Sequence, residues 1–168
     1  MEELFDFSGK VALITGGSRG LGRQMALAYA ARGADLVIAS RKLENCISVV
    51  DEVEAMGRKG LAISVDATQW DDMDRLADAA YAAFGKVDIL VNNAGKSPAI
   101  ASHEITERQF DGVVDLNFKG PFRLAANIGR RMADAEGGVI INISSMAAVK
   151  PVTGVISCWT PSPKSNFN

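Results

Sequence analysis

A run of small residues could bind phosphate groups: it follows the first apolar stretch and reads Thr15-Gly16-Gly17-Ser18-Arg19-Gly20-Leu21-Gly22. Glycines let the backbone turn sharply and approach a ligand, because no Cβ stands in the way. The helix expected after the run offers unpaired N–H groups and a partial positive charge to an anion. The spacing is Gly-x-x-x-Gly-x-Gly, and it predicts a site for the pyrophosphate of a dinucleotide. A plain strand-to-helix turn is the alternative interpretation.

The end of the second apolar stretch, about 20 residues further on, indicates which dinucleotide would bind. An acidic residue there would accept hydrogen bonds from the ribose 2′-hydroxyl, but this chain has Ala39-Ser40-Arg41-Lys42. A guanidinium can bind a 2′-phosphate bidentately. Arg41, together with Arg19 of the glycine run, therefore favours NADP over NAD as the cofactor. Alternatively, Arg41 and Lys42 are only the solvated start of a helix.

The elements that must position these residues follow an alternating pattern of short apolar stretches and helical segments. The stretches are four or five residues long and rich in β-branched side chains: 11–14, 36–39, 61–65, 87–91 and 139–143. Being mostly apolar on both faces, they are typical of parallel strands covered on both sides. The sequence predicts an α/β fold with a doubly wound parallel sheet. Thr68 is the expected N-cap of the helix between the third and fourth strands.

Composition is that of one globular domain: 168 residues, of which 48% are hydrophobic and 23% charged. The net charge of −2 leaves no basic field for nucleic acid, and no apolar run approaches the ~20 residues of a membrane helix. The acidic start lacks the pattern of a signal peptide. Cys46 and Cys158 have neither metal-ligand nor redox-pair spacing. We therefore expect a cytoplasmic protein without a metal, a nucleic-acid partner or a membrane partner.

Two further motifs follow the fourth and fifth stretches, Asn92-Asn93-Ala94-Gly95 and Asn142-Ile143-Ser144-Ser145. With the glycine run they occur in the order found in the short-chain dehydrogenase/reductase family, which residues 7–157 resemble. The resemblance implies a Rossmann-like sheet with strand order 3-2-1-4-5, in which the family's last two strands are missing. It also implies NADP-dependent hydride transfer to or from a carbonyl or secondary alcohol, and a homo-oligomer.

The resemblance implies a role for individual residues. Ser145 would orient the substrate oxygen, and the main-chain carbonyl of Asn117 would hold a water in a proton relay. Asp66 and Ala67 would contact the adenine. The remaining cofactor-binding residues are those of the glycine run (Thr15, Gly16, Ser18, Arg19, Gly20, Leu21 and Gly22), the second strand end (Ser40 and Arg41) and the Asn-Asn-Ala-Gly motif (Asn92, Ala94 and Gly95).

Asn117 is also singled out by its spacing from a proline. Pro121 lies four residues after it and has no N–H. The carbonyl of Asn117 thus loses its helical partner, and the sequence predicts a kink with an unbonded carbonyl. A kink that only follows the curvature of the core is the alternative interpretation.

The proton donor of the family is the residue that this sequence lacks. In the family a Tyr stands 13 residues after the Ser, with a Lys four residues further on; here these positions are Cys158 and Ser162. A thiol is a weak hydrogen-bond donor, and no Lys stands at the position from which it would lower the pKa. The sequence departs from the family's pattern after about residue 157. We expect an incomplete dinucleotide-binding domain over 1–157 and an irregular tail over 158–168. We also expect the fifth strand to form an uncovered edge of the sheet. The alternatives to an impaired oxidoreductase are a non-catalytic NADP-binding remnant and a truncated product that acts, if at all, through association.

Overall fold

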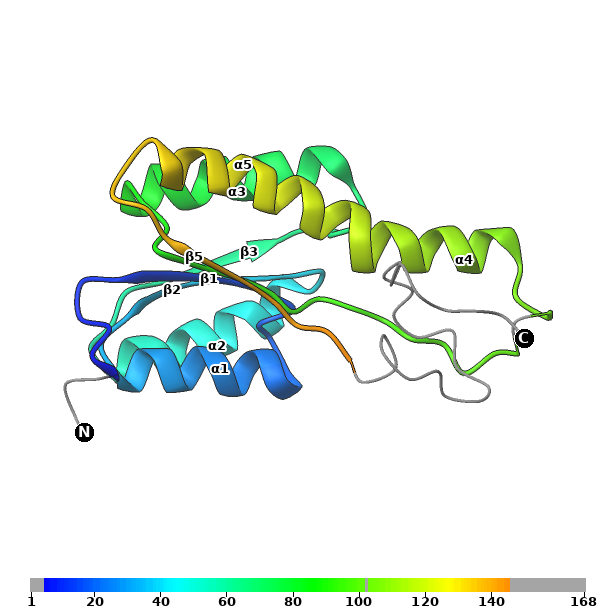
Figure 1. The fold of residues 1–168 in the computed structure, drawn as a ribbon. Coiled ribbons are helices and arrows are strands. Elements are labelled where there is room, and N and C mark those ends of the chain that lie inside the picture. The colour runs from blue at the N-terminus through cyan, green and yellow to red at the C-terminus, as the bar shows by residue number, and fades with distance from the viewer. Residues whose placement is uncertain (1–4, 102, 146–168) are drawn as a thin grey trace.

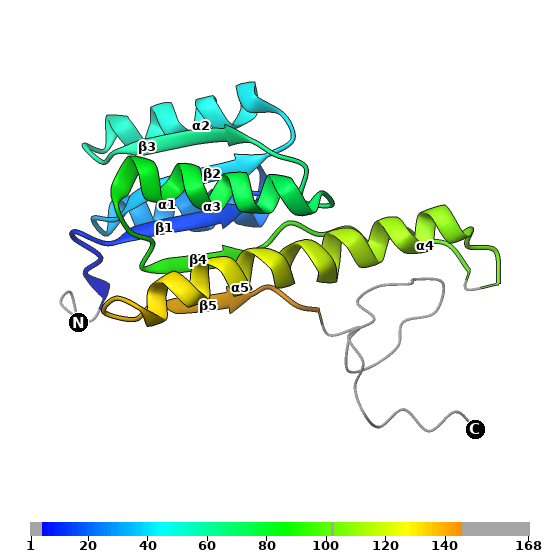
Figure 2. The same ribbon diagram turned by 90° about the horizontal axis from the view of Figure 1, so that it is seen from above.

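The sheet is parallel and five-stranded, with the order β3-β2-β1-β4-β5 (Figures 1 and 2). It is seen in a computed structural model that describes residues 5–101 and 103–145. The elements are β1 (Val11–Thr15), α1 (Gly20–Ala31), β2 (Asp35–Ser40), α2 (Leu43–Ala55), β3 (Gly60–Ser64), α3 (Trp70–Phe84), β4 (Ile89–Asn92), α4 (Glu107–Val114), the π-helical turn η2 (Asp115–Lys119), α5 (Gly120–Ala133) and β5 (Val139–Asn142). The doubly wound fold and its strand order, both predicted from the sequence, are confirmed.

Helices cover both faces of the sheet, α1 and α2 on one side and α3 and α5 on the other (Figure 1). Alternate residues of a strand therefore enter different cores: Leu13 packs toward α3 and α5, whereas Ile14 packs toward α1 and α2. Both side chains are fully buried. This two-sided burial explains why the strands read as nearly continuous apolar runs.

β5 forms an edge of the sheet that is poorly covered. Val139 and Ile143 are 55% and 40% exposed, although Ile141 packs partly against the core. Within the described ranges no strand pairs with the outer side of β5. The uncovered fifth strand predicted from the sequence is thus confirmed for this part of the chain.

The start of α3 differs from the sequence-based prediction. Gln69, and not Thr68, is the N-cap residue, and α3 begins at Trp70. Thr68 lies in the turn before α3, where its N–H and its hydroxyl both donate to Oδ1 of Asp66, at 3.0 and 2.9 Å. The N-cap prediction for Thr68 was therefore wrong: its hydroxyl donates to Asp66 and accepts from Nε2 of Gln69 at 2.8 Å, and the N-cap position is taken by Gln69.

A π-helical turn, η2, joins α4 to α5 close to Pro121. The N–H of Gly120 donates to the carbonyl of Asp115, five residues back. The predicted irregularity in this helix therefore takes the form of a π turn. Gly120 also packs against the turn after β3, where a Cβ at its position would lie only 1.9 Å from the carbonyl oxygen of Ala67.

Ion pairs fasten α5 to α3 on the outer side of this layer. Asp74 of α3 accepts hydrogen bonds from Nε and Nη2 of Arg123 at 2.7 and 2.6 Å, and from Asn127 at 2.8 Å. The guanidinium of Arg123 also lies over the ring of Trp70, 4.7 Å from its centroid. Hydrogen bonds from Arg123 and then Asn127 hold the pKa of Asp74 below its usual value.

None of the helices described is both long and apolar enough to cross a bilayer. The same residues contain no group of three or more His, Cys, Asp or Glu side chains that could hold a metal ion.

The close packing of Gly120 gives a first prediction. Gly120→Ala should lower the free energy of unfolding by about 2 kcal/mol or more, because its Cβ collides with a backbone oxygen that cannot move cheaply. Gly129→Ala is the control on the same helix, since its Cβ would meet only the end of the Ile140 side chain, at 3.3 Å. Urea denaturation measures both. Equal stabilities of the two variants would contradict the assigned contact.

The Asp74 pair gives a prediction for pH. A carboxylate whose folded pKa is lowered stabilises the fold above its unfolded pKa, and this contribution disappears as the pH falls through the folded value. Asp74→Asn should therefore be less stable than the parent chain at neutral pH. The difference in unfolding free energy should shrink below the ordinary Asp pKa of 3.8. Denaturation series from neutral to acid pH measure this, with the exposed Asp51→Asn as the control. A difference that stays constant to about pH 3 would contradict the prediction.

Candidate dinucleotide site

The residues predicted to bind a cofactor gather at one edge of the sheet. Because all strands run in parallel, Thr15, Ser40, Ser64, Asn92 and Asn142 end their strands at the same, carboxyl edge. Ligands of doubly wound folds bind at this edge. α4 extends beyond it (Figure 2).

The glycine turn after β1 has the conformation that its sequence predicts. Gly16 and Gly20 have φ angles of 64° and 53°, a region that residues with a Cβ rarely adopt. A Cβ at Gly22 would lie 2.3 Å from the carbonyl oxygen of Gly16. By contrast, no atom lies within 4 Å of the Cβ position of Gly20, so space remains beside the turn at that residue.

The N-terminus of α1 lies directly after this turn. Arg19 is its N-cap residue, but its side chain makes no capping hydrogen bond, and no acidic residue stands in the first turn. The first N–H groups of α1 are thus uncapped by side chains of the described chain, and they can donate to an anion. These features fit a pyrophosphate.

Asn93 locks the glycine turn to the turn after β4. Its Nδ2 donates to the carbonyl oxygens of Thr15 and Gly16, at 3.0 and 3.2 Å. In return, the buried hydroxyl of Thr15 accepts from the main-chain N–H groups of Asn93 and Ala94, at 3.1 and 3.2 Å. The sequence reading assigned no role to Asn93. The only signal that could have found it was its place in the motif beside Asn92.

A pair of side-chain amides joins the ends of β4 and β5. Nδ2 of Asn92 donates to Oδ1 of Asn142 at 2.9 Å. Asn92 is buried, and its own Oδ1 has no hydrogen-bond partner among the described residues. An unsatisfied buried acceptor is costly, and a bound hydroxyl group at this edge would satisfy it.

The positions expected to select the cofactor are cationic. Arg19 and Arg41 are both exposed, and neither makes an ion pair within the described part of the chain. Arg23 of α1, by contrast, is neutralised by Glu52 at 2.5 Å. The two guanidinium groups predicted to meet a 2′-phosphate thus keep their hydrogen-bonding capacity for a ligand.

The structure places the other predicted cofactor residues at the same edge. Ser18 is half-buried in the glycine turn, and Leu21 is exposed in the first turn of α1. Asp66 and Ala67 follow β3, and one carboxylate oxygen of Asp66 is occupied by Thr68.

The predicted catalytic residues reach this edge from two other elements. Asn117 of η2 binds the main chain of Lys96: Oδ1 accepts from its N–H at 2.9 Å, and Nδ2 donates to its carbonyl at 2.8 Å. This pairing brings Asn117 beside Gly95, in the loop after β4. Ser145 is exposed just beyond β5. Cys158 and Ser162 lie outside the described residues.

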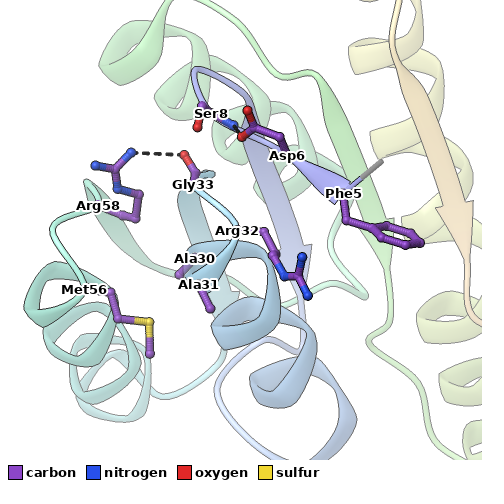
Figure 3. A pocket seen from close by; sticks show the side chains of 9 residues that line it. All are labelled: Phe5, Asp6, Ser8, Ala30, Ala31, Arg32, Gly33, Met56 and Arg58. Atoms are coloured by element: carbon purple, nitrogen blue, oxygen red, sulfur yellow. Dashed lines mark hydrogen bonds between the residues drawn. The ribbon is translucent and has the colours of Figure 1, made fainter. Parts of the chain in front are cut away.

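A cavity of about 550 Å³ lies at the opposite edge of the sheet. Asp6, Ser8, Arg32 and Arg58 are among its lining residues (Figure 3), and Arg58 donates to the carbonyl of Gly33 at 3.2 Å. These segments precede β1, β2 and β3, so the cavity opens at the amino ends of the strands. It contains none of the residues singled out by the sequence.

Comparison with known proteins agrees with this arrangement. The family model of the short chain dehydrogenases matches residues 10–157. The chain is 38% identical over 143 residues to the 2-dehydro-3-deoxy-D-gluconate 5-dehydrogenase of Escherichia coli, covering 84% of this chain and 56% of that protein. The chain thus spans a little over half the length of this curated relative.

Two solved structures superpose closely on the fold. A metagenomic short-chain oxidoreductase in complex with NADP has a TM-score of 0.84 at 34% identity, covering 88% of this chain and 67% of that one. A 7α-hydroxysteroid dehydrogenase complexed with NADH and 7-oxo glycochenodeoxycholic acid has a TM-score of 0.86 at 34% identity, covering 89% and 58%. Sequence motifs, strand order and these matches agree, and the chain belongs to the short-chain dehydrogenase family.

Proposed function

We propose that this chain binds NADP at the carboxyl edge of its sheet, with the pyrophosphate at the N-terminus of α1. The observation that carries the proposal is the uncapped start of α1 directly after the glycine turn, with Arg19 as its N-cap residue and Arg41 after the adjacent strand β2. Ser40 stands where an acidic residue would favour NAD, so the site offers two cations and no carboxylate to the ribose 2′ position. The related structures hold NADP in one case and NADH in the other, which leaves Arg41 as the reason for preferring NADP.

The chemistry that NADP supplies when bound is hydride transfer to or from a carbonyl or secondary alcohol. The chain's own residues would hold the cofactor and orient the substrate. Asn92 would accept a hydrogen bond at its buried Oδ1, and Ser145 would donate one from its hydroxyl to the substrate oxygen. Asn117 would offer its main-chain carbonyl to a water, as in the family.

We also propose that catalysis by this chain is impaired. The family's Tyr and Lys positions are Cys158 and Ser162, and a thiol without a neighbouring Lys is a poor proton donor. A cofactor-binding protein with little turnover is therefore the second candidate function, and it needs only the edge described above.

Arg41 tests the cofactor preference. Arg41→Ala should weaken NADPH binding by about 10- to 100-fold, because it removes charge-assisted hydrogen bonds to the 2′-phosphate. NADH binding should stay within about twofold, since NADH lacks this phosphate. Arg32→Ala is the matched control, because Arg32 is an exposed arginine at the opposite edge. Calorimetric titration measures the affinities. Equal losses for both cofactors, or none for either, would refute the assignment of Arg41.

Turnover tests the second part of the proposal. NADPH oxidation with a panel of ketones and sugar-acid carbonyls should be at least about 10²-fold slower than in a family member that has both Tyr and Lys, because general acid catalysis is lost. A thermal shift with NADPH in the same preparation shows that the cofactor site is intact. A rate equal to that of the complete family member would contradict impairment. A missing thermal shift would instead contradict the cofactor site.

A further inference from the structure

Ser40, the last residue of β2, and Arg41, the first residue after it, are held by side chains from two neighbouring elements. We infer that Ser64, at the end of β3, is a positioning residue that sets the preference for a 2′-phosphate by fixing the main chain of Arg41. The inference rests on the proposed binding of NADP. It adds a residue that neither the glycine run nor the motifs point to.

The contact that carries the inference is a single hydrogen bond between strands. Oγ of Ser64 donates to the carbonyl oxygen of Arg41 at 3.1 Å. Ser64 pairs with Ser40 in the register of β2 and β3, and the N–H of Val65 donates to the carbonyl of Ser40 at 3.0 Å. The pairing of the two strands thus reaches the last residue of β2, and the Ser64 hydroxyl extends this support to Arg41.

Ser64 is itself fixed from the side of α3. Nη2 of Arg75 donates to the carbonyl oxygen of Ser64 at 3.1 Å, and to Oδ1 of Asp72 at 2.7 Å. Oδ2 of Asp72 accepts from the N–H of Asp66 at 2.7 Å. A continuous set of hydrogen bonds therefore joins α3, the end of β3 and the turn that carries Arg41.

Ser40 is held by the buried thiol of Cys46 in α2. Sγ of Cys46 lies 3.0 Å from Oγ of Ser40 and 3.8 Å from the carbonyl oxygen of Ile63. Cys46 is fully buried in the core between α2 and the sheet. With Ser40 held by Cys46 and Arg41 held by Ser64, the last residue of β2 and the first residue after it are both restrained.

This restraint matters because a bidentate contact from the long Arg41 side chain requires that the main chain of Arg41 be held in a defined position. The arginine side chain loses conformational entropy on binding, and a mobile backbone beneath it adds to that loss. Without the Ser64 hydroxyl, the carbonyl of Arg41 loses this partner and the turn gains freedom. Binding of the adenosine and its 5′-phosphate should not change, because the glycine turn is locked separately by Asn93.

The experiment compares two probes that differ only in the phosphate at issue. Calorimetry with 2′,5′-ADP and with 5′-AMP gives the ratio of their affinities for the whole chain. In the parent chain 2′,5′-ADP should bind at least about 10-fold more tightly. In Ser64→Ala this ratio should fall about three- to tenfold, while 5′-AMP affinity stays within about twofold. Ser64→Thr, which keeps a hydroxyl, should restore the ratio. Ser48→Ala, at an exposed position of α2, should leave it unchanged.

The outcomes separate this inference from the proposed function. If the parent chain binds the two probes equally, the preference for NADP is wrong. If the parent chain discriminates and Ser64→Ala retains the full ratio, the role of Ser64 is wrong while NADP binding stands. A loss of affinity for both probes in parallel, with a lower melting temperature, would show a merely structural role and would also overturn the inference.

Discussion

The cofactor edge depends on one interaction, the mutual hydrogen bonding of Thr15 and Asn93. These residues end or follow β1 and β4, which are adjacent strands that are distant in the sequence. The amide of Asn93 satisfies the carbonyls of the glycine turn, and the hydroxyl of Thr15 satisfies the N–H groups of the turn after β4. Buried polar groups are seldom left unpaired, so each of the two turns supplies hydrogen-bond partners that the other needs. The uncapped start of α1 and the amide of Asn92 are placed by this pair.

The sequence was sufficient for the fold and for the shape of the glycine turn, because the relevant signals are local. Apolar runs on both faces predict buried parallel strands, and glycines predict the sharp turn at Gly16, Gly20 and Gly22. The exposed outer side of β5, as it stands in the described residues, could also be foreseen. The failures involve competition between hydrogen bonds. Thr68 is a good capping residue by type, but its hydroxyl accepts from the side chain of Gln69 and donates to Asp66 instead. The roles of Asn93 and Ser64 depend on partners in other strands, and no spacing within one segment reveals them.

The proposed function separates cofactor binding from catalysis in this chain. The groups that would hold a dinucleotide lie on the ends of β1, β2, β3 and β4 and the turns after them, within a well-packed sheet. α5 is positioned against this sheet by the contact of Gly120 with Ala67 and by the ion pair of Arg123 with Asp74. η2, between α4 and α5, in turn presents Asn117 to the loop after β4. The proton donor depends instead on the identities of residues 158 and 162, which differ from the family's pattern. A chain of this kind can keep the affinity for its cofactor and lose the rate of its reaction.

Phosphorus NMR of NADP titrated with this chain tests the central claim most directly, because the 2′-phosphate and the pyrophosphate give separate resonances. The account predicts that both signals shift and broaden on binding, the first through Arg41 and the second through the start of α1. Perturbation of the pyrophosphate alone would contradict the selection of NADP. No perturbation of either signal would contradict the dinucleotide site itself.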